Sequence, residues 1–151
     1  MPIKTIQQGP WRDDLIARIR VEAQPPEKFS HQARLYRLAR QIADASSDSF
    51  DDEVLFGAAW VHDLGVFIGH RPEDLDALKR WDSTAYTVAH APTVLEACGF
   101  PPGKIAAVLA CIRTHEASGT PTTLEGTILR DADLLEQLGA IAVMRTAAKI
   151  A

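Results

Sequence analysis

The sequence has few cysteines, no cluster of basic residues and no long apolar run. Its two cysteines are Cys98 and Cys111, and neither belongs to a CxxC pair. This usage argues against a disulfide scaffold and favours a reducing compartment. No apolar stretch approaches membrane-spanning length, and the N-terminus lacks the basic-then-apolar pattern of a signal peptide. We therefore expect a soluble, cytoplasmic protein that does not interact with membranes.

The charge balance is mildly acidic. The net charge of the 151 residues is −4, and there is no run of Lys and Arg. A surface that binds nucleic acid polymers by neutralising phosphates is therefore not expected. A small anionic substrate remains compatible with this charge, because a metal ion supplies positive charge locally.

The chain also lacks internal repeats, low-complexity tracts and linkers, which predicts one domain over residues 1–151. No segment shows sustained two-residue alternation, and the apolar residues recur at helical spacing. We predict an all-α, single-domain helical bundle of about six to seven helices. The expected helices lie between Pro10 and Pro25, from Ser30 past Ile42, from Asp52 to near Gly65, from Ser83 to Cys98 with a kink at Pro92, around Ile105–Ile112, and from Thr123 onward, with 134–151 as an extension or a seventh helix.

The most informative stretch is the apolar run 54–65, which ends in the adjacent pair His62 and Asp63. Burying an unpartnered charge is costly, so such groups are paired, hydrogen-bonded or bound to metal. The pair therefore needs partners from elsewhere in the chain.

Three other segments supply such partners. Residues three, four or seven apart on a helix share a face. By this spacing His31, His62, His115 and Asp131 each continue the apolar stripe of their own predicted helix, and Asp63 adds a carboxylate. The pattern predicts one shared site at the edge of the core.

The ligand set consists of imidazoles and carboxylates without thiolates. Such a set suits Mn²⁺, Fe, Mg²⁺, Ni²⁺ or Zn²⁺, and we favour manganese or iron. Four protein ligands from an octahedral set leave open positions for water and for a substrate phosphate oxygen.

These residues resemble the HD-domain metal-dependent phosphohydrolases. The pattern of that family is a histidine, an adjacent His-Asp pair and a distant aspartate, all on helices. The H-x-x-R-hydrophobic start is present at 31–35, and LEGTILRDADLLEQLGAI at 124–141 is similar to a stretch of a bacterial branch of small HD proteins. The resemblance covers about residues 30–145. It implies a divalent metal held by His31, His62, Asp63 and Asp131.

The same resemblance implies further roles and shows two departures. Asp63 and His115 are the expected catalytic residues, and Arg34, His70 and Arg71 the expected substrate-binding ones. The branch often has an aspartate three residues before its first histidine, where this chain has Lys28. The segment 66–82 resembles the family only loosely, so the identity of the substrate is what the resemblance implies least.

Plainer interpretations compete for several of these residues. His115 is as compatible with a structural role as with an outer contact to the site. His90 matches no family position and is expected on a helix surface. Arg34 is expected to pair with an acid, and His70 with Arg71 to be a solvated loop pair. Asp133 falls away from the apolar stripe and is expected to be solvated or an outer hydrogen-bond acceptor.

The function expected from this resemblance is a metal-dependent phosphohydrolase acting on a nucleotide or another small phosphate ester or anhydride. Two alternatives stay open. One is an HD-type oxygenase with two irons, the second held with help from His115 and His90. The other is a regulatory domain that binds metal or nucleotide without catalysis. The chain ends soon after the predicted helix of Asp131, and we therefore expect either a more open pocket or a surface for a homodimer.

Overall fold

The structure, a computed structural model, describes residues 10–116 and 118–150, with side chains up to Gly139. Within these residues the protein is helical, and its one β-type contact is an isolated bridge between Ile68 and Arg71. The all-α prediction is therefore confirmed. The α-helices are α1 (Trp11–Glu22), α2 (Glu27–Ala45), α3 (Asp52–Val61), α4 (Leu75–Lys79), α5 (Ser83–Cys98), α6 (Ile105–Arg113) and α7 (Leu124–Ile150), with short 3₁₀ turns η1 (Leu64–Val66) and η2 (Pro102–Lys104).

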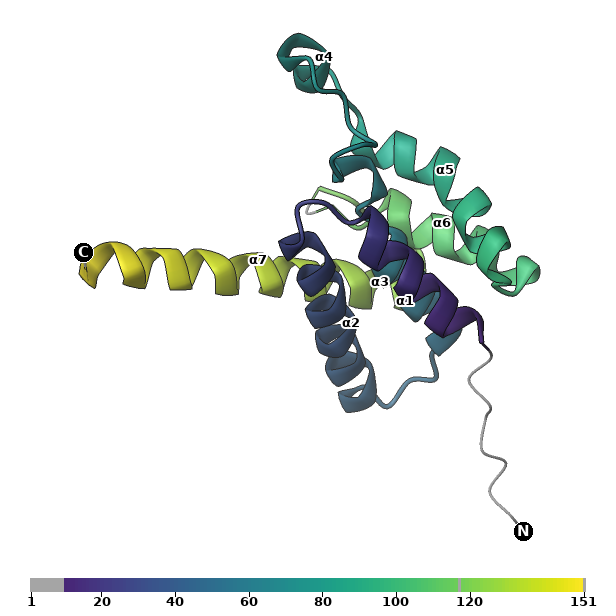
Figure 1. Cartoon of the computed structure of the whole chain (residues 1–151). Helices are drawn as coiled ribbons and strands as arrows, with labels where there is room; N and C mark the ends of the chain where they lie inside the picture. The colour runs from purple at the N-terminus through teal and green to yellow at the C-terminus, as the bar shows by residue number, and fades with distance from the viewer. Residues whose placement is uncertain (1–9, 117, 151) are drawn as a thin grey trace.

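Helix α3 lies at the centre of the bundle. Every residue from Val54 to Val61 is buried, and the helix contacts α1, α2, α5, α6 and α7. A helix that is apolar on all sides is stable only when other elements cover all of its faces. The apolar run found in the sequence is thus the element around which the other helices pack (Figure 1).

Several helix limits differ from those expected. Helix α2 begins at Glu27 and not at Ser30, so His31 lies in its second turn. Helix α3 ends at Val61, and His62 forms its C-cap. Residues 124–150 form the single helix α7. Leu135 and Leu138 lie four and seven residues after Asp131, so helical spacing predicts them on the same inner stripe, but they are 49% and 61% exposed.

The chain that follows α3 is fixed against α5. The backbone N–H of Gly65 donates to Thr87 Oγ1 at 2.9 Å, and Trp81 Nε1 donates to the carbonyl oxygen of Gly65 at 2.7 Å. A Cβ at position 65 would collide with the backbone of Ser83. Glycine is required here by this close approach, which holds the His62–Asp63 corner in place.

Two parts of the fold stand away from the bundle. Figure 1 shows α4 on an arm above the other helices and the C-terminal half of α7 projecting beyond them. The short α4 lies in segment 66–82, the part of the chain that resembles the family only loosely. None of the described helices is long and apolar enough to cross a membrane.

Candidate metal centre

Three of the predicted ligands meet at the end of α3. His31 comes from α2, and His62 and Asp63 come from the corner after α3. One ligand atom from each lies within 4.8 Å of the other two. His31 Nε2 is 3.6 Å from Asp63 Oδ2, and His62 Nε2 is 3.4 Å from Asp63 Oδ1. Residues more than thirty positions apart in the sequence therefore present donor atoms to one point.

The fourth group at this point is Asp133, in place of Asp131. Asp133 Oδ1 lies 3.5 Å from His31 Nε2, and the residue is only 7% exposed. Asp131 points elsewhere: its side chain is 46% exposed, and its nearest charged partner is Arg130, at 3.7 Å. The expectation that Asp131 joins the cluster is therefore corrected to Asp133.

The physical reason for this correction is the rotation of α7. Side chains two residues apart on a helix are rotated by about 200° relative to each other, so only one of the two aspartates faces the core. The buried residues of this segment are Ile128, Leu129, Ala132 and Asp133. Their spacing of one, three and one is itself helical, and it identifies Asp133. The stripe assumed from the sequence instead relied on leucines that the structure exposes.

His62 carries the clearest sign of a missing ligand. Its Nδ1 lies 2.7 Å from the carbonyl oxygen of Ala59. A carbonyl only accepts, so Nδ1 holds the proton and Nε2 presents a lone pair. Nε2 is buried and has no hydrogen-bond partner. An unpartnered buried acceptor costs free energy unless something fills its position, which a metal ion does.

His115 repeats this arrangement on the other side of His62. Its Nδ1 lies 2.6 Å from the carbonyl oxygen of Ile112, and its ring centroid is 5.2 Å from that of His62. The residue is 8% exposed and lines the same cavity as His31. The backbone carbonyl thus accepts the proton of Nδ1 and leaves the lone pair on Nε2 of a second imidazole that lines the cavity.

Sequence reasoning missed two supporting residues. Gln32 is fully buried and donates from Nε2 to Asp63 Oδ2 at 3.2 Å. Glu136 Oε1 accepts from Arg34 Nε at 2.6 Å and lies 3.6 Å from His31 Nδ1. The pairing of Arg34 with an acid agrees with the structural role expected for it. A polar residue beside His31 on the buried side of α2 was the available signal for Gln32.

The charges of the cluster are strongly coupled. Burial lowers the pKa of His62 despite the nearby Asp63 carboxylate. Burial also acts to lower the pKa of His31, but its hydrogen bond with Asp133 and the charges of Asp63 and Glu136 raise it overall. For both aspartates burial acts to raise the pKa, and the neighbouring histidines lower it. The carboxylates are therefore kept ionised, and His62 is kept neutral and able to donate its lone pair.

The donor set fits a divalent ion. Metal bonds of about 2.1 Å place neighbouring ligands of an octahedron about 3.0 Å apart and opposite ligands about 4.2 Å apart. The three separations given above, 3.4 to 3.6 Å, lie within that range. The imidazole and carboxylate atoms thus have the type and spacing that such an ion needs.

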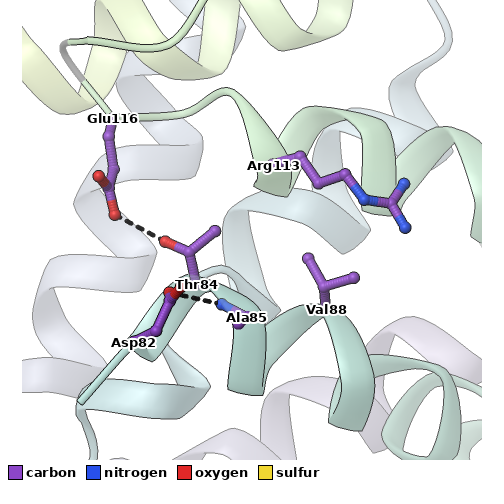
Figure 2. A pocket seen from close by; sticks show the side chains of 6 residues that line it. All are labelled: Asp82, Thr84, Ala85, Val88, Arg113 and Glu116. Carbon is purple, nitrogen blue, oxygen red and sulfur yellow. Dashed lines mark hydrogen bonds between the residues drawn. The ribbon is translucent and has the colours of Figure 1, made fainter. Parts of the chain in front are cut away.

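One hollow adjoins the cluster, and a second shares a lining residue with the first. The first has a volume of about 450 Å³ and is lined by His31, Asp63, His115 and Asp133, with Lys28 among its other lining residues. The second, of about 510 Å³, lies between the start of α5 and the end of α6 (Figure 2). Both hollows share Glu116, which accepts a hydrogen bond from Thr84 Oγ1 at 2.6 Å.

Three other residues considered from the sequence lie outside the first hollow. His70 Nδ1 is 2.8 Å from the Tyr86 hydroxyl, and its Nε2 is 3.1 Å from Glu22 Oε1. His90 stacks on Tyr86, with ring centroids 5.2 Å apart. Arg71 does not line either hollow among the described residues. His70 therefore anchors the loop, and the substrate-binding roles expected for His70 and Arg71 have no support in this geometry.

Comparison with known families agrees with this arrangement. A family model of the HD domain matches residues 29–138, which is more than half of the chain. The protein therefore belongs to the HD-domain family, whose members are generally metal-dependent hydrolases. No curated protein and no solved structure matches the sequence.

Proposed function

We propose that this protein is a metal-dependent phosphohydrolase that acts on a nucleotide or another small phosphate ester or anhydride. The proposed ligands of the divalent ion are His31, His62, Asp63 and Asp133. The observation that carries the proposal is the buried Nε2 of His62, which has no hydrogen-bond partner and lies 3.4 Å from Oδ1 of Asp63, a residue that lines the cavity. Manganese and iron are the favoured ions, because imidazole and carboxylate together suit them.

The chemistry that a bound divalent ion supplies is a more acidic water and a polarised phosphoryl oxygen. The protein contributes fixed orientation. Ala59 holds the His62 tautomer through Nδ1, and Gln32 holds one oxygen of Asp63. The Ile112 carbonyl in the same way leaves Nε2 of His115 free at the cavity. His115 Nε2 is thus the proposed acceptor of a proton from the attacking water, and Asp63 orients that water.

The test is phosphate release by the purified protein. With Mn²⁺ added, we expect release of phosphate or pyrophosphate from at least one member of a panel of nucleotides and phosphate monoesters. His62→Ala abolishes this activity and lowers metal content, because it removes the donor with no other partner. His90→Ala is the matched control and keeps both, since His90 packs on Tyr86 away from the cluster. Absence of turnover across the panel with several metals contradicts the proposal.

The oxygenase alternative is weakened by the position of His90. It contacts His70 and Tyr86, so of the two extra histidines only His115 adjoins the cluster. Metal analysis decides the matter: two irons per chain with oxygen uptake supports the oxygenase. A bound nucleotide that is never hydrolysed supports a purely regulatory domain.

A further inference from the structure

Lys28 is a basic residue of the metal-site cavity that has no assigned partner. It lies on α2 three residues before His31, one helical turn away on the same face. It is partly buried and lines the cavity together with His31, Asp63 and Asp133. Within the part of the chain that the structure describes, its ammonium makes no ion pair and no side-chain hydrogen bond.

Several other polar groups around this cavity already have partners. Arg34, one turn after His31, is held by Glu136 at 2.6 Å. Glu116 accepts from Thr84, and Asp63 accepts from Gln32. Of Lys28 and Arg34, the two lysine or arginine residues of the cavity lining, Lys28 is the one that makes no ion pair among the described residues. Its charge reaches the cluster, since burial raises the pKa of Asp63 while His62, His31 and Lys28 lower it.

The charge balance of the cavity shows why a free cation matters. The two carboxylates Asp63 and Asp133 balance the two charges of a divalent ion, and Glu116 adds a further negative charge to the lining. A phosphate monoester carries nearly two negative charges at neutral pH, and a diester carries one. By this count Lys28 cancels the charge of Glu116, so without Lys28 the cavity is net negative and disfavours the second negative charge of a monoester. An ammonium group binds phosphate oxygens as a compact point charge.

We propose that Lys28 determines substrate specificity, by binding a terminal phosphate oxygen and selecting substrates with a terminal phosphate group over phosphodiesters. This inference rests on the proposed phosphohydrolase function. Lys28 is assigned no part in bond breaking. Its contact would be made equally in the ground state and the transition state, so its removal raises KM and leaves kcat nearly unchanged.

The experiment compares Lys28→Met and Lys28→Arg with the wild-type protein. Substrates are para-nitrophenyl phosphate and bis-para-nitrophenyl phosphate, which share a leaving group and differ in phosphate charge. We expect Lys28→Met to raise KM for the monoester about 10- to 100-fold, the range for losing a hydrogen bond to a charged group. kcat/KM for the diester changes less than about 2-fold, and Lys28→Arg keeps most of the monoester preference.

The matched control is Lys79→Met, because Lys79 is exposed on α4 away from the cavity. Metal content and thermal unfolding are measured for every variant, and we expect them to match the wild type. Equal losses for both substrates, or no change in KM, overturn the proposal.

Calorimetric titration of inorganic phosphate into the manganese-loaded protein separates this inference from the proposed function. If the wild type hydrolyses neither ester but binds phosphate, and Lys28→Met loses that binding about 10-fold or more, the phosphohydrolase proposal fails and the role of Lys28 stands. Equal phosphate binding by wild type and variant overturns the role of Lys28, as does an absence of phosphate binding by the wild type.

Discussion

The polar groups at the two ends of α3 differ in whether they have partners within the chain. At the N-terminal end every acid has a partner. Asp51 caps the helix by accepting from the N–H groups of Glu53 and Val54, and it pairs with Lys104 at 2.9 Å. At the C-terminal end His62 Nε2 is buried without a hydrogen-bond partner.

A second acid shows the same contrast. Asp52 accepts from Tyr36 at 2.8 Å and pairs with Arg12 at 3.1 Å and Arg40 at 3.0 Å. Near Asp63, by comparison, the basic groups are titratable histidines and Lys28. The N-terminal end of α3 is therefore arranged for stability, whereas the C-terminal end keeps donor atoms that suit a metal ion.

The largest effect we expect separates the two aspartates of α7. Asp133→Asn lowers metal affinity more than about 100-fold, because losing a ligand costs more than losing a residue that only supports one. Asp131→Asn leaves the affinity unchanged, since that carboxylate is exposed beside Arg130. Isothermal titration with Mn²⁺ measures both. The reverse ranking shows that α7 is rotated relative to the structure described here.

A smaller effect tests the support of Asp63. Gln32→Leu lowers metal affinity by about 10- to 100-fold, the usual range when a residue that orients a ligand is removed. The unfolding free energy of the metal-free variant is equal to or higher than that of the wild type, because Gln32 Oε1 is buried without a hydrogen-bond partner and its removal relieves that cost. Gln41→Leu, on the exposed side of α2, is the control for metal affinity. A metal affinity equal to wild type in Gln32→Leu refutes this role.

A substitution at the N-terminal end of α3 is expected to change the stability of the protein and not its metal affinity. Asp51→Ala removes the cap of α3 and lowers the unfolding free energy by about 1 kcal/mol. Metal affinity stays at the wild-type value, since the cap lies at the far end of the helix. Urea unfolding and Mn²⁺ titration of the same preparation test both halves. Loss of metal affinity in this variant shows that the two ends are coupled.

The smallest effect concerns the pH dependence of that same end. Burial acts to raise the pKa of Asp51, but Lys104 and the capping N–H groups hold it below its ordinary value of 3.8. Glu53 and Asp51 raise the pKa of Lys104 above 10.5. A lowered carboxyl pKa contributes stability above pH 3.8 that disappears as the pH falls through the lower folded value. A raised lysine pKa contributes stability below pH 10.5 that disappears at higher pH.

Asp51→Asn keeps the cap and removes only the charge. We therefore expect its deficit in unfolding free energy to be present between about pH 4 and 10 and to vanish in stronger acid. Unfolding curves of the metal-free protein across this range measure it. A deficit that persists unchanged below pH 3 means that the carboxylate acts through its shape alone.

Much of this architecture was predictable because the signals are local. The apolar run of α3, the His62–Asp63 pair and the helical spacing before and after them are visible in a short window of sequence. These signals predicted an all-α bundle in which His31, His62 and Asp63 lie at one site. The start of α2 and the continuity of α7 were less predictable, because helix limits depend on caps and on tertiary contacts.

The choice between Asp131 and Asp133 depended on which face of α7 is covered. That face is set by packing against α2, α3 and α6, which periodicity alone does not reveal. Leu135 and Leu138 suggested an inner stripe, yet both are exposed. Apolar residues at the surface are common, so the buried polar residues Gln32 and Asp133 carried more information about the site than the exposed leucines.

The proposed ligands are contributed by α2, by the corner after α3 and by α7, so the ion would join positions 31 and 133 across most of the domain. Such an ion acts as a reversible cross-link that exists only when the chain is folded. By mass action it adds about 2.7 kcal/mol to the unfolding free energy when its free concentration is 100 times its dissociation constant. The melting temperature of the protein would then report the metal supply of its surroundings, and depletion of the ion would loosen the bundle at the same time as it empties the proposed catalytic site.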